Sequence, residues 1–167
     1  MLILSLLMAV AYVAAVIIKD RALPDSISAL VYALPKGRCR WLWSLWLALV
    51  TLLMAPAFTA AMAATWWTSL LADATIICLS MTAALPLLPG YHNRLHNALG
   101  ITSGVLSQVC VWFISPWWLL SWFLLVAAWI WTTKDTARTA FDGKGVFIAE
   151  CICYLAIIGS MLTVMAV

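Results

Sequence analysis

The sequence predicts an all-α fold, a polytopic bundle of six transmembrane helices with a short amphipathic helix at the membrane interface between the first two spans. Two thirds of the residues (66%) are apolar and only 9% are charged, whereas soluble domains carry about 25% charged residues. The apolar runs are long enough to cross a hydrocarbon core about 30 Å thick, which takes roughly 20 helical residues. We therefore expect residues 1–167 to form a single integral membrane domain.

The first span, from about Leu2 to Ile18, lacks the basic leading region and the cleavage site of a signal peptide, so we expect it to be retained. A single helix from Trp41 to Leu88 would be far too long for the bilayer, which places a turn before Trp66. The five remaining spans are predicted to cover approximately residues 41–58, 66–88, 97–114, 117–131 and 146–167.

The longest connector, between the first two spans, contains the predicted interfacial helix at residues 25–34. Asp25 or Ser26 can cap its start, and Pro35 ends it. Ser28 and Tyr32 lie four residues apart on its more polar side. Apolar residues recur at the i, i+3, i+4, i+7 spacing of an amphipathic helix, which favours a position along the membrane surface: Ile27, Leu30, Val31 and Leu34.

The basic residues indicate the orientation. All nine lysines and arginines lie in or beside the connectors that follow the first, third and fifth spans. The positive-inside rule then places these connectors in the cytoplasm and both termini outside, as in a multi-pass protein of the bacterial inner (plasma) membrane. Tryptophans should mark the two interfaces, Trp66, Trp67, Trp117 and Trp118 on the outside and Trp41, Trp43, Trp129 and Trp131 on the inside.

The fourth span is predicted to lie at the centre of the bundle, because polar and small residues recur along it at steps of three and four. Gly100 and Gly104 form a G-x-x-x-G pair, which allows another helix to approach closely in lipid. Residues at this spacing share one helix face, and the set comprises His96, Gly100, Ser103, Gly104, Ser107 and Gln108.

Two acids fall inside the spans, where an unpaired carboxylate is unfavourable. Asp73 is expected to hydrogen-bond Ser107 or Gln108 as a structural clasp, with a proton or cation relay as the alternative. Glu150 lies about one turn below the cytoplasmic face. Its side chain either reaches back to the cytoplasmic interface, where it helps to stabilise the start of the last span, or pairs with His96, Tyr32 or a basic loop residue.

Metal and cofactor sites have little support in the sequence. His92 and His96 are four apart and can present two imidazoles to one metal ion on a helix. Asp142 or Glu150 would have to supply a further ligand, so hydrogen-bonding histidines at the interface are favoured. The five cysteines form no disulfide framework, no P-loop or dinucleotide motif is present, and the dispersed basic residues form no nucleic-acid surface. We expect no cofactor.

One set of residues resembles the alkaline ceramidase-like superfamily of membrane hydrolases, whose site combines a Ser, an Asp and several His near the cytoplasmic side. The chain departs from that family in having six predicted spans and two histidines, where the family usually has seven spans and three histidines. The chain as a whole resembles the small multi-span proteins of bacterial inner membranes. The resemblance implies a site formed by Ser28, Asp73 or Asp142, and His92 with His96.

Three function classes remain open. We favour a non-catalytic assembly partner or lipid-binding accessory, because the sequence holds no complete catalytic set. The first alternative is a small oligomeric transporter or channel that uses the intramembrane acids. The second is a membrane-embedded lipid hydrolase that uses Glu150, His96, Tyr32 and Ser28. Expected partners are membrane lipid and either further copies of the chain or a larger membrane complex.

Overall fold

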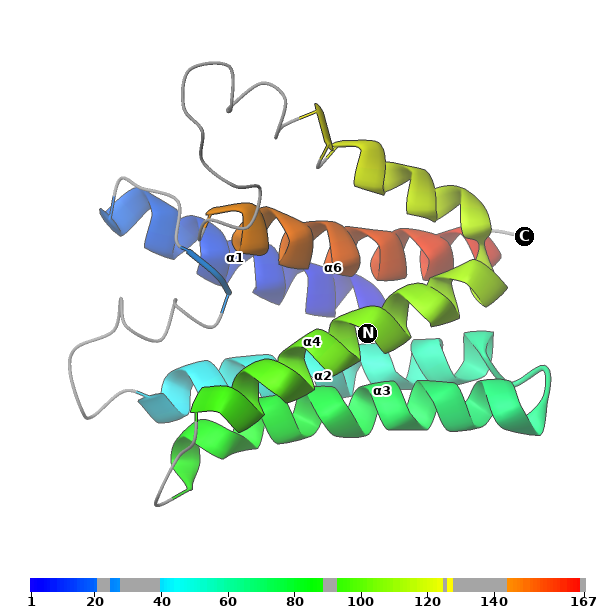
Figure 1. The fold of residues 1–167 in the computed structure, drawn as a ribbon, viewed down its shortest axis with the longest axis horizontal. Coiled ribbons are helices and arrows are strands. Elements are labelled where there is room, and N and C mark those ends of the chain that lie inside the picture. Colours follow the sequence, from blue (N-terminus) through cyan, green and yellow to red (C-terminus); the bar gives the residue numbers. More distant parts are fainter. Residues whose placement is uncertain (21–24, 28–39, 89–92, 125, 128–143, 166–167) are drawn as a thin grey trace.

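Five long helices form most of the computed structural model, which describes residues 1–20, 25–27, 40–88, 93–124, 126–127 and 144–165 (Figure 1). Two short 3₁₀ segments, η2 (Leu85–Leu87) and η3 (Pro116–Ser121), follow the third and fourth of them. The long helices are α1 (Leu2–Asp20), α2 (Arg40–Ala61), α3 (Trp66–Ala84), α4 (Asn93–Ile114) and α6 (Lys144–Met165).

The all-α, multi-span prediction is confirmed for these five helices, each long and apolar enough to cross a membrane. A helix is the expected form, because backbone groups have no water to bond in a hydrocarbon core. The fifth predicted span begins as the 3₁₀ segment η3, and residues 125 and 128–131 of it lie outside the described residues. The six-span count, the compartment and the sidedness of the bundle stay predictions.

The interfacial helix predicted at residues 25–34 falls mainly outside the described residues. Only Asp25, Ser26 and Ile27 are described, and they form a bend and a turn. This short segment matters nonetheless, because its backbone contacts the candidate site.

Thr65 and Thr68 mark the start of α3. Composition alone does not locate this boundary, because apolar residues continue from α2 into α3. The Thr65 hydroxyl accepts a hydrogen bond from the Thr68 amide at 3.4 Å, and the Thr65 amide donates to the Thr68 hydroxyl at 3.1 Å. This reciprocal pair satisfies two amide groups at the helix start, as in a capping box. The Thr68 hydroxyl also donates to the Met62 carbonyl at 2.6 Å, which joins the end of α2 to the start of α3.

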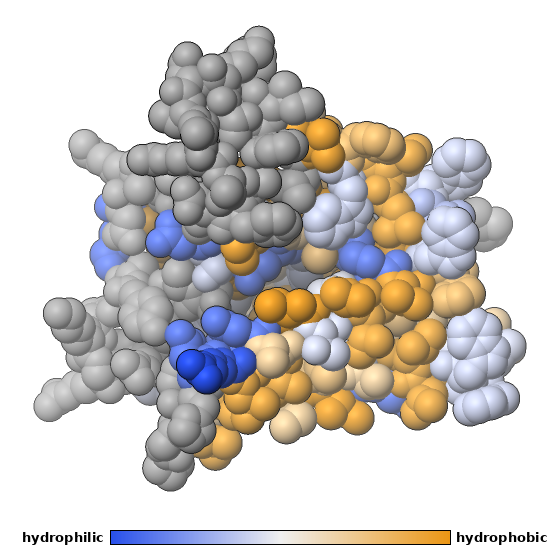
Figure 2. Space-filling model, viewed as in Figure 1, coloured by the Kyte–Doolittle hydropathy of each residue, from blue (hydrophilic) through white to orange (hydrophobic). Residues whose placement is uncertain are grey.

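The helices pack as an up-and-down bundle. In Figure 1 the α2–α3 turn and the α4–η3 turn lie at one end, and α2, α4 and α6 begin at the other. We call the second end the connector end. α1 and α3 both pack against α2, α4 packs against α3 and α6, and η3 packs against α4 and α6. Apolar side chains cover much of the α3 and α4 side of the molecule (Figure 2).

The tryptophans only partly follow the predicted belts. Trp66 and Trp117 are strongly exposed beside the two turns, as expected for an interface. Trp43 was expected at the inner interface but is turned into the bundle, with only 1% of its surface exposed. Its indole Nε1 donates to the Ile27 carbonyl at 3.1 Å, so a buried backbone acceptor holds it there.

Candidate functional site

A cavity of about 830 Å³ lies among the helices, with walls from α1, α2, α3, α4 and α6. Its volume falls within the range of roughly 300–1,000 Å³ that is typical of small-molecule sites. Most of the wall is apolar. Its acidic, amide and imidazole side chains belong to residues at the connector end of the bundle, whereas hydroxyl groups line it farther along. The polar residues there are Asp25, Ser26, His96, Asn97 and Glu150.

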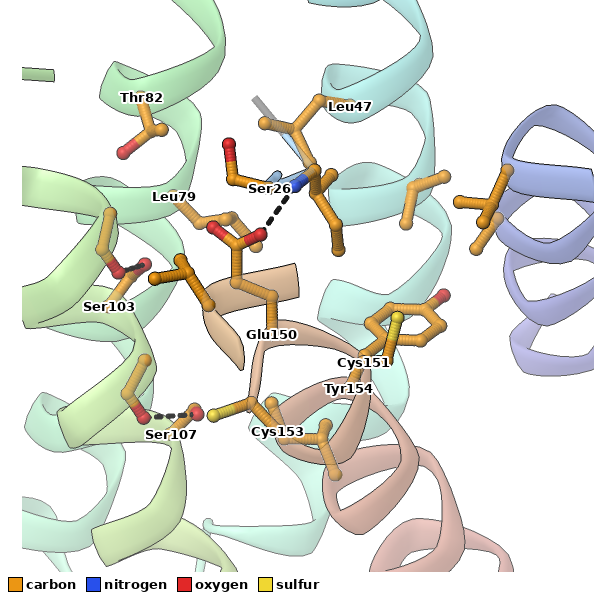
Figure 3. A pocket seen from close by; sticks show the side chains of 18 of the residues that line it. Ser26, Leu47, Leu79, Thr82, Ser103, Ser107, Glu150, Cys151, Cys153 and Tyr154 are labelled. Carbon is orange, nitrogen blue, oxygen red and sulfur yellow. Dashed lines mark hydrogen bonds between the residues drawn. The ribbon is translucent and has the colours of Figure 1, made fainter. Parts of the chain in front are cut away.

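Glu150 is the acid that enters the cavity from the first turns of α6. Its carboxylate accepts a hydrogen bond from the Ile27 amide (Figure 3). Since the Ile27 carbonyl accepts from Trp43, residues of α2 and α6 hold the same peptide segment. The partner that the structure shows for Glu150 is therefore a backbone amide. Tyr32 and several basic residues of the connectors lie outside the described residues, so a side-chain partner for Glu150 stays a prediction.

His96 lines the same cavity from the start of α4, and only 3% of its surface is exposed. Its ring lies against Trp43, with ring centroids 5.6 Å apart and a tilt of 53°. It is also hydrogen-bonded to the backbone of Thr82 on α3. His96 thus links α4 to α2 and α3, and it also lines the cavity.

The hydroxyl groups of Thr75, Ser103 and Ser107, farther along the walls, donate hydrogen bonds to backbone carbonyls of their own helices. The Thr75 hydroxyl donates to the Leu71 carbonyl at 2.8 Å, and the Ser103 hydroxyl donates to the Gly100 carbonyl at 2.8 Å. The Ser107 hydroxyl behaves similarly. These side chains therefore offer no free donor to a guest, and the far part of the cavity is bounded chiefly by apolar groups, including Leu6, Val50, Met54 and Ile157.

Gly100 and Gly104 both line the cavity, but they do not form one tight crossing. A Cβ atom at Gly100 would lie 3.9 Å from Thr82 Cγ2 on α3. A Cβ atom at Gly104 would lie 3.9 Å from Cys153 Sγ on α6. Both distances are ordinary van der Waals contacts, and the two glycines face different helices. The expected close docking of one helix on the pair is therefore wrong.

The clasp expected between Asp73 and α4 is also not formed. Asp73 is exposed on α3 and does not line the cavity. Gln108 instead donates to the Ser107 hydroxyl at 3.0 Å and accepts from the Trp122 indole at 2.9 Å. The rotation of α3 about its axis decides this result, because Ala72 and Thr75 occupy the buried side.

A close contact between η3 and α6 was not anticipated from the sequence. The Trp118 ring lies over Gly159, and its Nε1 donates to the Thr163 hydroxyl at 2.9 Å. A Cβ atom at position 159 would lie 2.5 Å from three ring carbons. The sequence gives little indication of this contact, because a single glycine in an apolar span does not show which residue packs against it.

Ser5 provides a second unanticipated link, between α1, α2 and α6. Its hydroxyl donates to the Val50 carbonyl at 2.9 Å and lies 2.8 Å from the Tyr154 hydroxyl. Ser5 is fully buried, so these bonds satisfy polar groups that lipid cannot.

Within the described residues, no group of three or more His, Cys, Asp or Glu side chains has the arrangement of a metal site. Of the weak metal candidates, His96 is placed at the cavity, whereas His92 and Asp142 lie outside the described residues. Ser28 and Tyr32 also lie outside them. The Ser, Asp and His set of the hydrolase resemblance is thus represented only by His96, and by Asp73 at a position away from the cavity.

Comparison with protein-family models, with curated proteins and with solved structures finds no significant match to this chain.

Proposed function

We propose that this membrane protein binds a single-chain amphiphile in the cavity, with the polar head beside Glu150 and the tail between the helices. The observation that carries the proposal is the asymmetry of the walls. Acidic and amide side chains gather at the connector end, whereas the rest is bounded by apolar residues such as Leu6, Val50 and Met54 and by hydroxyl groups that donate to carbonyls of their own helices. A ligand site with a mainly apolar wall and a few localised polar groups selects a molecule of matching polarity.

The edge of the cavity supports access from the membrane. Three apolar residues that line it are also exposed on the bundle surface: Val10 on α1, Ile101 on α4 and Leu155 on α6. In a bilayer these surfaces contact acyl chains, so a tail can enter sideways without crossing water. The proposal makes the protein a lipid-binding accessory, which is the class that we favoured from the sequence.

The two alternative classes draw less support from the described residues. A relay for protons or cations was expected to use Asp73 together with Glu150, but Asp73 is exposed on α3 outside the cavity wall. A lipid hydrolase was expected to use Ser28 and Tyr32, which lie outside the described residues. Lipid binding needs only the walls that are described.

Photolabelling tests the proposal. A hexadecanol analogue with a diazirine near the chain end, whose uncharged head is not repelled by Glu150, would be added to the protein in phosphatidylcholine nanodiscs, and labelled peptides would be identified by mass spectrometry. We expect labelling of the α2 wall around Val50 and Met54, which faces the cavity. Labelling confined to exposed outer residues such as Val105 would contradict the proposal.

A matched pair of variants sharpens this test. Gly104→Leu places a bulky side chain in the cavity wall, whereas Val105→Leu enlarges a neighbouring exposed residue. We expect the labelling of Met54 to fall several-fold in Gly104→Leu and to persist in Val105→Leu. Equal labelling in both variants would show that the probe does not occupy the cavity.

A further inference from the structure

We infer that the amphiphile carries a protonated amine as its head group and that Glu150 is the residue that recognises it. This inference rests on the proposed function, because it names the ligand class of the same cavity. It follows from three features of the polar end, which are the signs of the described charges on the wall, the hydrogen-bonding capacity of Glu150 and the partial burial of Glu150.

The two charged residues that the structure describes in the wall are both acidic. Asp25 and Glu150 line the cavity, and none of the described lining residues is Lys or Arg. Lys19 and Arg94 belong to the same end of the bundle, but both are exposed and neither contributes to the wall. Against the described part of the wall, a phosphate, sulfate or carboxylate head would therefore meet like charges.

The Glu150 carboxylate can accept more than the one hydrogen bond that the structure shows for it within the described residues. A carboxylate offers about four acceptor positions and no donor, and the Ile27 amide occupies one of them. The carboxylate points into the cavity in Figure 3, beside Ser26 and Leu79. The complementary head group is a donor, and an ammonium group supplies three N–H donors from one atom.

The surroundings favour a charged donor over a neutral one. A carboxylate in apolar surroundings is stabilised by an opposite charge, and hydrogen bonds between ions are roughly twice as strong as neutral ones. A hydroxyl head would satisfy the geometry but would leave the negative charge uncompensated. A quaternary ammonium head would supply the charge but no N–H donor. A comparison of amine, alcohol and quaternary ammonium heads on the same alkyl chain therefore distinguishes the effect of charge from the effect of hydrogen bonding.

The first experiment measures the thermal midpoint of the protein in phosphatidylcholine nanodiscs with equal mole fractions of hexadecylamine, hexadecanol, hexadecyltrimethylammonium or palmitic acid. We expect hexadecylamine to raise the midpoint most. Glu150→Gln keeps an oxygen for the Ile27 amide but removes the charge, so the advantage of the amine should vanish. Asp73→Asn removes an exposed acid outside the cavity and should keep that advantage, which controls for changes in bilayer charge.

A second experiment needs only the parent protein. A hydrophobic carbodiimide joins an amine to a carboxyl group as an amide and takes up the water that leaves, becoming the urea. With hexadecylamine present, the adduct should form on Glu150 several times more than on Asp73. Equal coupling at the two sites, or coupling at Asp73 alone, would overturn the assignment of Glu150.

The outcomes separate the two proposals. Equal shifts with hexadecylamine and hexadecanol, both lost in Gly104→Leu, would keep the cavity as a lipid site and refute the amine head. A larger shift with palmitic acid would also refute the amine head. The absence of a shift with every amphiphile would refute the proposed function together with this inference.

Discussion

Replacing Gly159 by alanine should disrupt the contact between η3 and α6. The added Cβ atom would lie 2.5 Å from Cε3, Cζ3 and Cη2 of Trp118, whereas carbon atoms pack at about 3.5–4.0 Å. The ring must therefore retreat by roughly 1 Å or more. That movement strains its 2.9 Å hydrogen bond to Thr163, because the donor is part of the same ring.

The magnitude follows from three terms. Overpacking destabilises by about 1–3 kcal/mol, and the weakened hydrogen bond adds about 0.5–1.5 kcal/mol. The better helix propensity of alanine offsets roughly 1 kcal/mol. We therefore expect Gly159→Ala to lower the free energy of unfolding by about 1–3 kcal/mol.

Gly104→Ala is the matched control in the neighbouring helix. Its Cβ atom would lie 3.9 Å from Cys153 Sγ, which is ordinary contact, so the propensity term should leave this variant equal to or slightly more stable than the parent. Reversible denaturation in mixed micelles, followed by circular dichroism, gives both values. Truncating the ring in a Gly159→Ala, Trp118→Leu double variant should remove most of the strain. Equal stability of Gly159→Ala and Gly104→Ala would refute the argument.

Three further predictions concern buried hydrogen bonds and topology. Ser5→Ala should destabilise by about 1–3 kcal/mol in the same assay, because it strips partners from a buried carbonyl and from Tyr154; an unchanged midpoint would show that the Tyr154 hydroxyl finds another partner. Gln108→Leu should destabilise by a similar amount, about 1–3 kcal/mol, by leaving the Trp122 indole without its acceptor, and Gln108→Glu should restore most of the loss. Single cysteines placed in residues 134–144 should react with a membrane-impermeant maleimide only after the cells are opened, and labelling of intact cells would reverse the predicted orientation.

Several features of the candidate site were predictable from residue type and spacing. His96, Ser103 and Ser107 recur at steps of three and four, and all three are buried on one face of α4. The spacing alone predicts this, because polar residues on a helix in lipid turn towards protein. Glu150 and His96, which the depth argument set near one another, both line the same cavity, and the distance between their side chains stays a prediction.

The sequence determined the helices themselves, because an uninterrupted apolar run in a bilayer has no other way to satisfy its backbone groups. The tertiary structure alone decided which groups meet. The partner of Glu150 is the Ile27 amide, and every residue except proline carries such a group, so no side-chain pattern announces it. Gly100, Gly104 and Gly159 look alike in a sequence, yet only Gly159 lies under a tryptophan ring. The cavity likewise depends on the tertiary structure, because five helices form its walls and its volume depends on how their side chains pack.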